Sequence, residues 1–142
     1  MLGKLGASFQ QGELIETGEM YSLIGGNANQ TFGKLMLESE FVTAHFSGQV
    51  LPGASARVHD NESGIYGLAD YSITEQWHLA LESEYYQDHT VALPSRNALL
   101  AIAYRPSNSP IVWKLEYINQ TGVPASIAPI VTGWQASFAT MF

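Results

Sequence analysis

The segment from Ile65 to Tyr85 reads IYGLADYSI-TEQ-WHLALESEY, and it decides the fold. Two runs rich in aromatic and branched residues flank a short polar link, which is typical of a β-hairpin. Closing the hairpin on residues 74–76 gives an apolar face, broken only by Ser83, that pairs Ile73 with Trp77, Tyr71 with Leu79, Ala69 with Leu81 and Ile65 with Tyr85. The other, mostly polar face pairs Ser72 with His78, Asp70 with Ala80, Leu68 with Glu82 and Tyr66 with Glu84. One register therefore separates apolar from polar residues on both strands, as an antiparallel pair with one buried face requires.

Residues 98–118 repeat this arrangement around a link that contains Pro106 and Pro110. Closing this hairpin gives an apolar face that pairs Tyr104 with Ile111, Ile102 with Trp113 and Leu100 with Leu115. The opposite face pairs Ala103 with Val112, Ala101 with Lys114 and Leu99 with Glu116. The small residues Ala101 and Ala103 share this face with Lys114 and Glu116, which indicates a narrow space on the polar side of the sheet.

The last nine residues, Trp134 to Phe142, alternate in the same way, with every second residue from Trp134 on one largely aromatic face. This strand resembles the C-terminal signature of Gram-negative outer-membrane β-barrel proteins, whose last strand ends in Phe and is read by the barrel-insertion machinery. The segment from Tyr104 to Tyr117 is similar to the C-terminal part of porin-like proteins of that membrane. In length the chain resembles the small eight-stranded members.

This resemblance implies an all-β fold, an antiparallel up-and-down transmembrane β-barrel of about eight strands in a bacterial outer membrane. It implies the lipid bilayer and the insertion machinery as partners, and it assigns the insertion signal to Trp134, Phe138 and Phe142. Aromatic residues near the predicted strand ends favour interfacial girdles.

Composition agrees with a protein that faces lipid. Charged residues make up 13% of the 142 residues and hydrophobic residues 46%, whereas about a quarter of a soluble domain is charged. No apolar run approaches the roughly 20 residues of a spanning helix. The absence of cysteine excludes disulfides and thiolate metal sites, and a net charge of −7 argues against nucleic acid as a partner. Since no signal peptide follows Met1, we expect a mature chain with an added start Met or a piece of a larger one.

The pattern predicts one domain over residues 1–142, with strands near 3–11, 20–26, 31–51, 63–74, 77–87, 97–105, 111–119 and 131–142. Residues 27–30 are predicted as a turn, and a change of parity near Phe41 and Val42 predicts a β-bulge. The connections then alternate between short (27–30, 74–76, 105–110) and long (12–19, 52–62, 88–96, 120–130), as in outer-membrane barrels. The alternative is that the chain forms the C-terminal part of a larger barrel.

The polar face of these strands is the candidate site. We expect it to form the barrel interior, with Lys34, Glu38, Glu40, His45, His78, Glu82, Glu84, Lys114 and Glu116. Such groups must pair or remain hydrated. They form either a satisfied network or a narrow acidic path that favours cations. His78 and Glu82 are about 13 Å apart along one strand, so they do not share a metal unless a neighbouring strand contributes. We expect no metal and no cofactor. The polar segments 59–62 and 87–90 are predicted as solvated outer loops, with cation binding as the alternative.

Catalysis is not expected. The predicted register places Ser83 and His78 on opposite faces, Gly-x-Ser-x-Gly is absent, and no Lys-Ser or Lys-Thr follows Gly25 and Gly26. The expected function is therefore a structural, pore-like or loop-mediated binding role of an outer-membrane barrel. The alternatives are the C-terminal segment of a larger porin-like channel for small solutes, and a soluble β-barrel that carries a small apolar ligand. In a lipid-facing barrel Trp77, Leu81 and Trp113 point outward, whereas in a soluble carrier they point inward.

Overall fold

The computed structural model describes residues 3–14, 19–49, 57–89, 93–122 and 132–140. Within them the chain forms one antiparallel sheet of eight strands in sequence order. The strands are β1 (Gly3–Leu14), β2 (Glu19–Phe32), β3 (Leu35–Gln49), β4 (Arg57–Ser72), β5 (Trp77–Asp88), β6 (Leu93–Tyr104), β7 (Ile111–Thr121) and β8 (Gly133–Thr140). The described part of the chain contains no helix that is long and apolar enough to span a membrane. The prediction of an all-β, up-and-down arrangement is confirmed.

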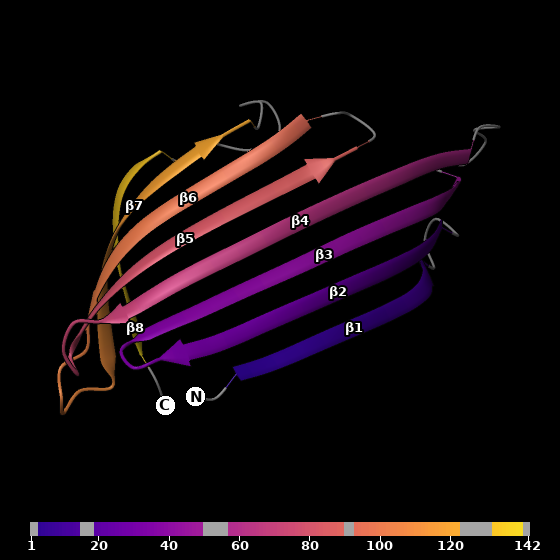
Figure 1. Ribbon diagram of the computed structural model, residues 1–142. Coiled ribbons are helices and arrows are strands. Elements are labelled where there is room, and N and C mark those ends of the chain that lie inside the picture. The colour runs from indigo at the N-terminus through magenta and orange to yellow at the C-terminus, as the bar shows by residue number, and fades with distance from the viewer. Residues whose placement is uncertain (1–2, 15–18, 50–56, 90–92, 123–131, 141–142) are drawn as a thin grey trace.

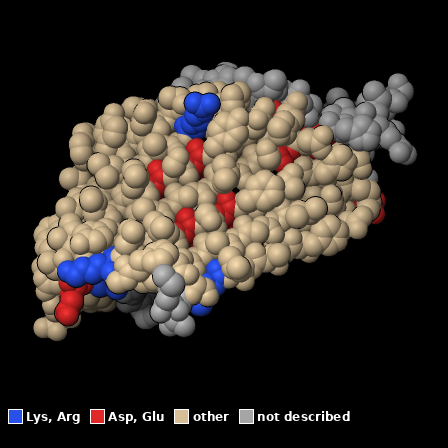
Figure 2. Space-filling model, in the orientation of Figure 1, with Lys and Arg blue, Asp and Glu red and all other residues tan. Residues whose placement is uncertain are grey.

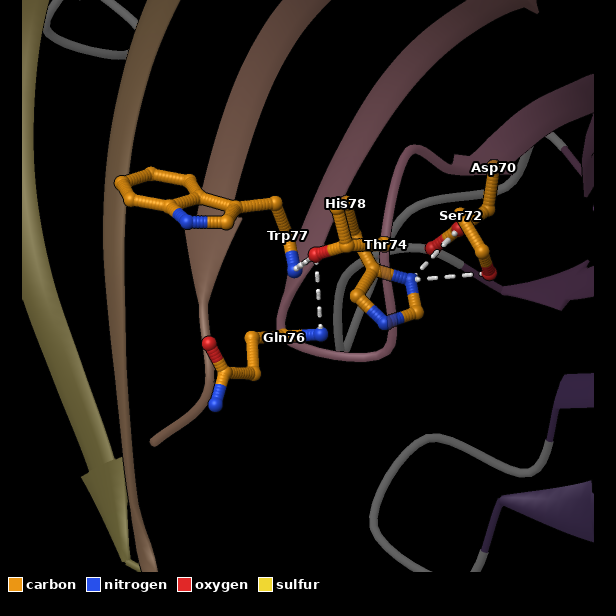
Figure 3. Close-up of polar contacts among 6 residues, drawn as sticks. All are labelled: Asp70, Ser72, Thr74, Gln76, Trp77 and His78. Carbon is orange, nitrogen blue, oxygen red and sulfur yellow. Dashed lines mark hydrogen bonds and ion pairs between the residues drawn. The ribbon is translucent and has the colours of Figure 1, made fainter. Parts of the chain in front are cut away.

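The β4–β5 hairpin has the predicted register throughout, from Ser72 opposite His78 to Ile65 opposite Tyr85. At its tip the Ile73 amide donates to the Trp77 carbonyl at 2.9 Å. Thr74 Oγ1 accepts hydrogen bonds from the amides of Gln76 at 3.2 Å and Trp77 at 3.1 Å (Figure 3). The polar link that predicted this turn therefore stabilises it directly, because its hydroxyl satisfies backbone donors that have no strand partner.

The β6–β7 hairpin differs from the predicted register by two residues. Tyr104 lies opposite Trp113 rather than Ile111, and Leu100 lies opposite Tyr117 rather than Leu115. The Arg105 amide donates to the carbonyl of Gln76 in the neighbouring turn, at 2.8 Å, so the link is anchored to β5 as well as to its own hairpin. A shift of two residues leaves every side chain on its predicted face, since the period of a strand is two.

Two predictions on the first half of the sheet are wrong. Residues 27–30 are not a turn but part of β2, and the chain reverses instead at Gly33 and Lys34, where Gly33 has a φ of 61°. The bulge near Phe41 is absent, because β3 pairs without interruption with both neighbours. Asn29 is a residue typical of turns, but here its Nδ2 donates to Glu38 Oε2 at 3.1 Å. Its side chain therefore belongs to the polar face of a strand, which is why the strand was not predicted at this position.

Three of the four predicted long connections are too long, and the fourth, 120–130, is shifted by two residues to 122–132. The segments between strands are 15–18, 50–56, 89–92 and 122–132 on one end of the sheet, and 33–34, 73–76 and 105–110 on the other. Much of the predicted loops 52–62 and 88–96 is strand, including Asp60, Glu62 and Asp88. The strands extend beyond the apolar pattern. The pattern did not indicate these strand ends, because they carry polar residues on both faces.

Strands β1 and β8 are the two edges of the sheet. No pairing and no close approach joins them among the described residues. The sheet is nonetheless strongly curved, and β8 runs behind the nearer strands in Figure 1. β8 shows the predicted alternation, with Trp134 opposite Tyr117 and Phe138 opposite Trp113. Phe142, the terminal residue of the predicted signal, lies outside the described residues.

The turn at Gly33 provides a test of this arrangement. Gly33→Ala is expected to lower the free energy of unfolding by about 1 kcal/mol, because a side chain strains left-handed backbone. The added Cβ would meet nothing within 4 Å, so the effect is conformational. Gly67→Ala is the matched control, since its Cβ position in β4 is equally open and its stability should stay equal or rise slightly. Urea denaturation followed by tryptophan fluorescence measures both, and equal losses in the two variants would contradict the β2–β3 turn.

Candidate functional site

The two faces of the sheet differ sharply in character. Every exposed large hydrophobic residue of the described strands and turns except Tyr86 lies on one face, which we call the apolar face. It includes Leu81, which is 56% exposed. Other members are Phe9, Ile24, Leu37, Phe41, Ile65, Trp77, Leu79, Leu100, Ile102, Trp113, Leu115 and Phe138. Figure 2 shows a broad uncharged surface on which acidic residues appear only as small areas. Because its side chains are exposed and the sheet curves away from it, we also call the apolar face the outer face.

Charged residues border the outer face instead of interrupting it. Glu13 and Arg96 lie near the end with the longer connections, and Glu75 and Arg105 lie in turns at the other end. Between these limits, the stretch from Trp77 to Tyr85 covers roughly 27 Å at about 3.4 Å per residue. A strand tilt of about 40° would reduce this to about 20 Å, close to the ~25 Å apolar band of outer-membrane barrels.

Aromatic side chains form a row along one border of the outer face. Trp77 contacts Tyr104 with ring centroids 4.6 Å apart, and Trp113 contacts Phe138 at 5.7 Å. Because Tyr104 pairs with both Trp77 and Trp113, the row crosses β5 to β8 without a gap. Such contacts between neighbouring strands stabilise the sheet by about 0.2–1 kcal/mol each.

The opposite, inner face contains most of the predicted site. Glu38 and Glu40 on β3, His78, Glu82 and Glu84 on β5, and Lys114 and Glu116 on β7 all lie there. Lys34 lies in the turn before β3, where its Nζ donates to the Ile73 carbonyl at 3.0 Å. His45 is on the outer face, where its ring contacts Asn61, because β3 has no bulge. Its assignment to the interior is therefore wrong.

Two rows of residues across β3, β4 and β5 give the inner face its acidic centre. Tyr66 lies between Glu40 and Glu84, and Leu68 lies between Glu38 and Glu82. The paired carboxylates are two strands apart, roughly 10 Å at the usual strand spacing. At this distance the repulsion between two carboxylates is only moderate when water separates them.

A cavity of about 500 Å³ adjoins these rows. Its polar lining consists of Glu38, Glu40, Glu62, Ser63, Tyr66, Glu84 and Tyr86. Tyr86 was not among the predicted interior residues, although its even spacing from Glu82 and Glu84 was a usable signal. The lining contains no Lys or Arg, so it favours cations over anions.

Glu116 is the buried charge of the inner face, only 3% exposed. Lys114 forms an ion pair with its Oε2, and Gln135 donates a hydrogen bond to its Oε1. Ala101, which is 2% exposed, lies directly opposite Glu116, and Ala103 lies opposite Lys114. Small residues therefore leave the room that the ion pair occupies, as the sequence pattern indicated.

His78 joins Asp70 and Ser72 on the inner face (Figure 3). Its Nδ1 lies 3.1 Å from Asp70 Oδ1 and 3.5 Å from Ser72 Oγ. A nucleophile and an orienting carboxylate must contact different ring nitrogens of a general base. Here both contact the same nitrogen, so the group suits a structural network rather than hydrolysis.

The β4–β5 end of the sheet holds two polar groups that the predicted registers did not bring together. Ser63 Oγ lies 3.0 Å from His89 Nε2. The carboxylates of Asp60, Glu62 and Asp88 converge within 4.8 Å of one another. Oxygen ligands at this spacing suit a hard divalent cation, although acidic groups often cluster without one. Neither contact was predicted, because Asp60, Glu62, Asp88 and His89 were placed in loops, which have no register.

Comparisons with protein-family models, with curated proteins and with solved structures found no match to this chain.

The Lys114–Glu116 pair yields a stability test. Lys114→Met is expected to lower the free energy of unfolding by roughly 2 kcal/mol, because it leaves the buried Glu116 carboxylate with one partner fewer. Adding Glu116→Gln should restore most of the loss. Lys34→Met, at an exposed turn, should stay within about 0.5 kcal/mol of the unmodified chain. Denaturant titration compares the variants, and a double variant no more stable than Lys114→Met would contradict the pairing.

Proposed function

We propose that the chain forms part of a bacterial outer-membrane β-barrel, with its apolar face toward lipid and its acidic face lining a hydrated path for small cations. The observation that carries this proposal is the separation of the two faces. Exposed Leu, Ile, Phe and Trp residues gather on one side, and the carboxylates gather on the other. Water does not favour so large an exposed apolar surface on a monomeric protein. A bilayer does, and a sheet provides the backbone hydrogen bonds that a span needs.

The soluble carrier is the alternative from another class. A carrier encloses its ligand with apolar side chains that point inward, away from water. Trp77, Leu81 and Trp113 are instead among the exposed residues. The cavity on the inner face has several carboxylates in its lining, which suits water and cations better than an apolar ligand. These features favour the membrane barrel over the carrier.

A larger porin-like ring is the second candidate. The exposure of side chains on the inner face favours it over a closed ring of eight strands. In eight-stranded barrels the interior is just wide enough for side chains to fill it. Here Glu84 and Tyr86 remain exposed on the inner face, and the described edges do not meet. A wider ring keeps such side chains hydrated and leaves room for solutes.

Recognition by the insertion machinery remains part of the proposal. Trp134 and Phe138 lie on the outer face of an edge strand, 69% and 65% exposed, where another protein can reach them. Pairing with an exposed strand edge is a common mode of recognition. Phe142 would complete the same alternation.

Membrane placement predicts that Leu81→Lys is costly only in lipid. In phospholipid vesicles it should lower stability by about 2–4 kcal/mol, the penalty for a lysine near the bilayer centre. Glu75→Lys, in the exposed turn outside the apolar band, should change stability by no more than about 0.5 kcal/mol. Denaturant titration in vesicles measures both. If Leu81→Lys is tolerated as well as Glu75→Lys, or if the chain folds as a monomer without detergent, the proposal fails.

Cation preference can be tested by conductance in planar bilayers. The reversal potential in a salt gradient should indicate a preference for cations. Replacing the two carboxylates that flank Tyr66, with Glu40→Gln and Glu84→Gln together, should reduce that preference several-fold. The control is Glu13→Gln with Glu75→Gln, which removes the same number of charges at positions outside the inner face. Equal effects of the two double variants would contradict a path along this face, and an absence of conductance would leave only the structural role.

A further inference from the structure

The edges of the sheet present backbone groups that need partners. β1 spans Gly3–Leu14 and β8 spans Gly133–Thr140, and in the described residues each pairs with a neighbour on one side only. In hydrocarbon each unpaired amide or carbonyl costs several kcal/mol, so membrane sheets close. Something must therefore pair with these edges if the chain spans a bilayer.

The most exposed apolar side chains also lie at these edges. Leu5 and Phe9 on β1 are 88% and 67% exposed, and Trp134 and Phe138 on β8 are 69% and 65% exposed. Each lacks a neighbour on one side. Because all four belong to the outer face, pairing β1 with a β8 would bring them together and continue the apolar band across the junction.

The inner side of the two edges is compatible with the same junction. β1 presents Ser8 and Gln10 on the inner face, and β8 presents Gln135 and Ser137. These are uncharged polar residues that tolerate water and can hydrogen-bond to one another. Direct opposition of like charges, which opposes strand pairing, does not arise among these four residues.

We propose that β1 of one copy pairs with β8 of a second copy, and β8 with β1 in return, so that two copies of eight strands close one sixteen-stranded barrel. This inference rests on the proposed function. An even number of alternating strands makes β1 and β8 antiparallel to each other, so the junction continues the existing pattern. The half-exposed inner face, with its cavity of about 500 Å³, suits a ring of 16–18 strands, which leaves an aqueous channel. The second copy also completes the lumen, which would otherwise open to lipid between the edges.

Aligning the two strand ends predicts the register of the junction. Leu5 then lies opposite Phe138, Ala7 opposite Ala136, and Phe9 opposite Trp134, with all three pairs on the outer face. A register shifted by two residues would keep the same faces together.

Cysteine cross-linking tests the pairing, since the chain has no native cysteine. Ala136→Cys chains are folded in detergent together with Leu5→Cys, Ala7→Cys or Phe9→Cys chains and treated with copper phenanthroline. Non-reducing electrophoresis should show a covalent species of twice the monomer mass for at least one combination. The control combines Ser8→Cys with Ala136→Cys chains. These side chains lie on opposite faces of the sheet, so this mixture should give little disulfide-linked product. A double variant with cysteines at Ser83 and Ala98, which are paired within one chain, marks the migration of an intrachain disulfide.

Each outcome decides between the possible partners of the edge strands. A chain that carries both Ala7→Cys and Ala136→Cys and yields only an intrachain disulfide in a monomer closes on itself, which contradicts the two-copy barrel. Absence of any β1–β8 disulfide in all three mixtures also contradicts it. In both cases, heat-dependent electrophoretic migration of the detergent-folded chain would leave the proposed membrane barrel intact. A chain that folds without detergent would instead overturn the proposed function itself.

Discussion

The rest of the structure depends on unbroken antiparallel pairing in which successive side chains alternate between two faces. Pairing without a bulge holds β3 in one register over its whole length, so each residue on its neighbours is committed to one side. Apolar residues thereby gather outside and carboxylates inside, although the two kinds are interleaved along every central strand. No helix in the described part of the chain assists this separation. The free energy of folding therefore comes from hydrogen bonds between neighbouring strands, from contacts between their side chains and from the medium that covers the apolar outer face.

On the inner face, this pairing places the charged side chains in two different arrangements. Where the strands bring Lys114, Glu116 and Gln135 together, Glu116 is buried and its charge is paired with that of the partly exposed Lys114. Where they bring Glu40, Tyr66 and Glu84 into one row, the carboxylates line a cavity and remain exposed. The same sheet thus contains a packed polar network on the β7 side and a hydrated acidic surface on the β3–β5 side. The second of these gives the protein its proposed preference for cations, and it would lose that function if side chains filled the interior.

Much of the fold could be predicted because strand periodicity is local. The β4–β5 register was predicted residue by residue, since a short polar link fixes which residues face each other. The β6–β7 register was wrong by two residues because its longer link bonds to the neighbouring turn through Arg105 and Gln76, a contact that the hairpin sequence does not encode. Asn29 was assigned to a turn, and His45 to the interior, because turn propensity and local parity were read without the partner strands. The carboxylates of Asp60, Glu62 and Asp88 meet only through tertiary pairing.

The sequence by itself determined which residues share a face of the central and C-terminal strands, because side chains alternate with a period of two whatever the partner. It also determined that one of those faces is apolar and the other acidic. Only the tertiary structure decided that the apolar face is the exposed one, how far the strands extend, and that β1 and β8 do not meet in the described residues. Curvature and closure depend on the twist and stagger accumulated over all the strands, and no single hairpin contains that information.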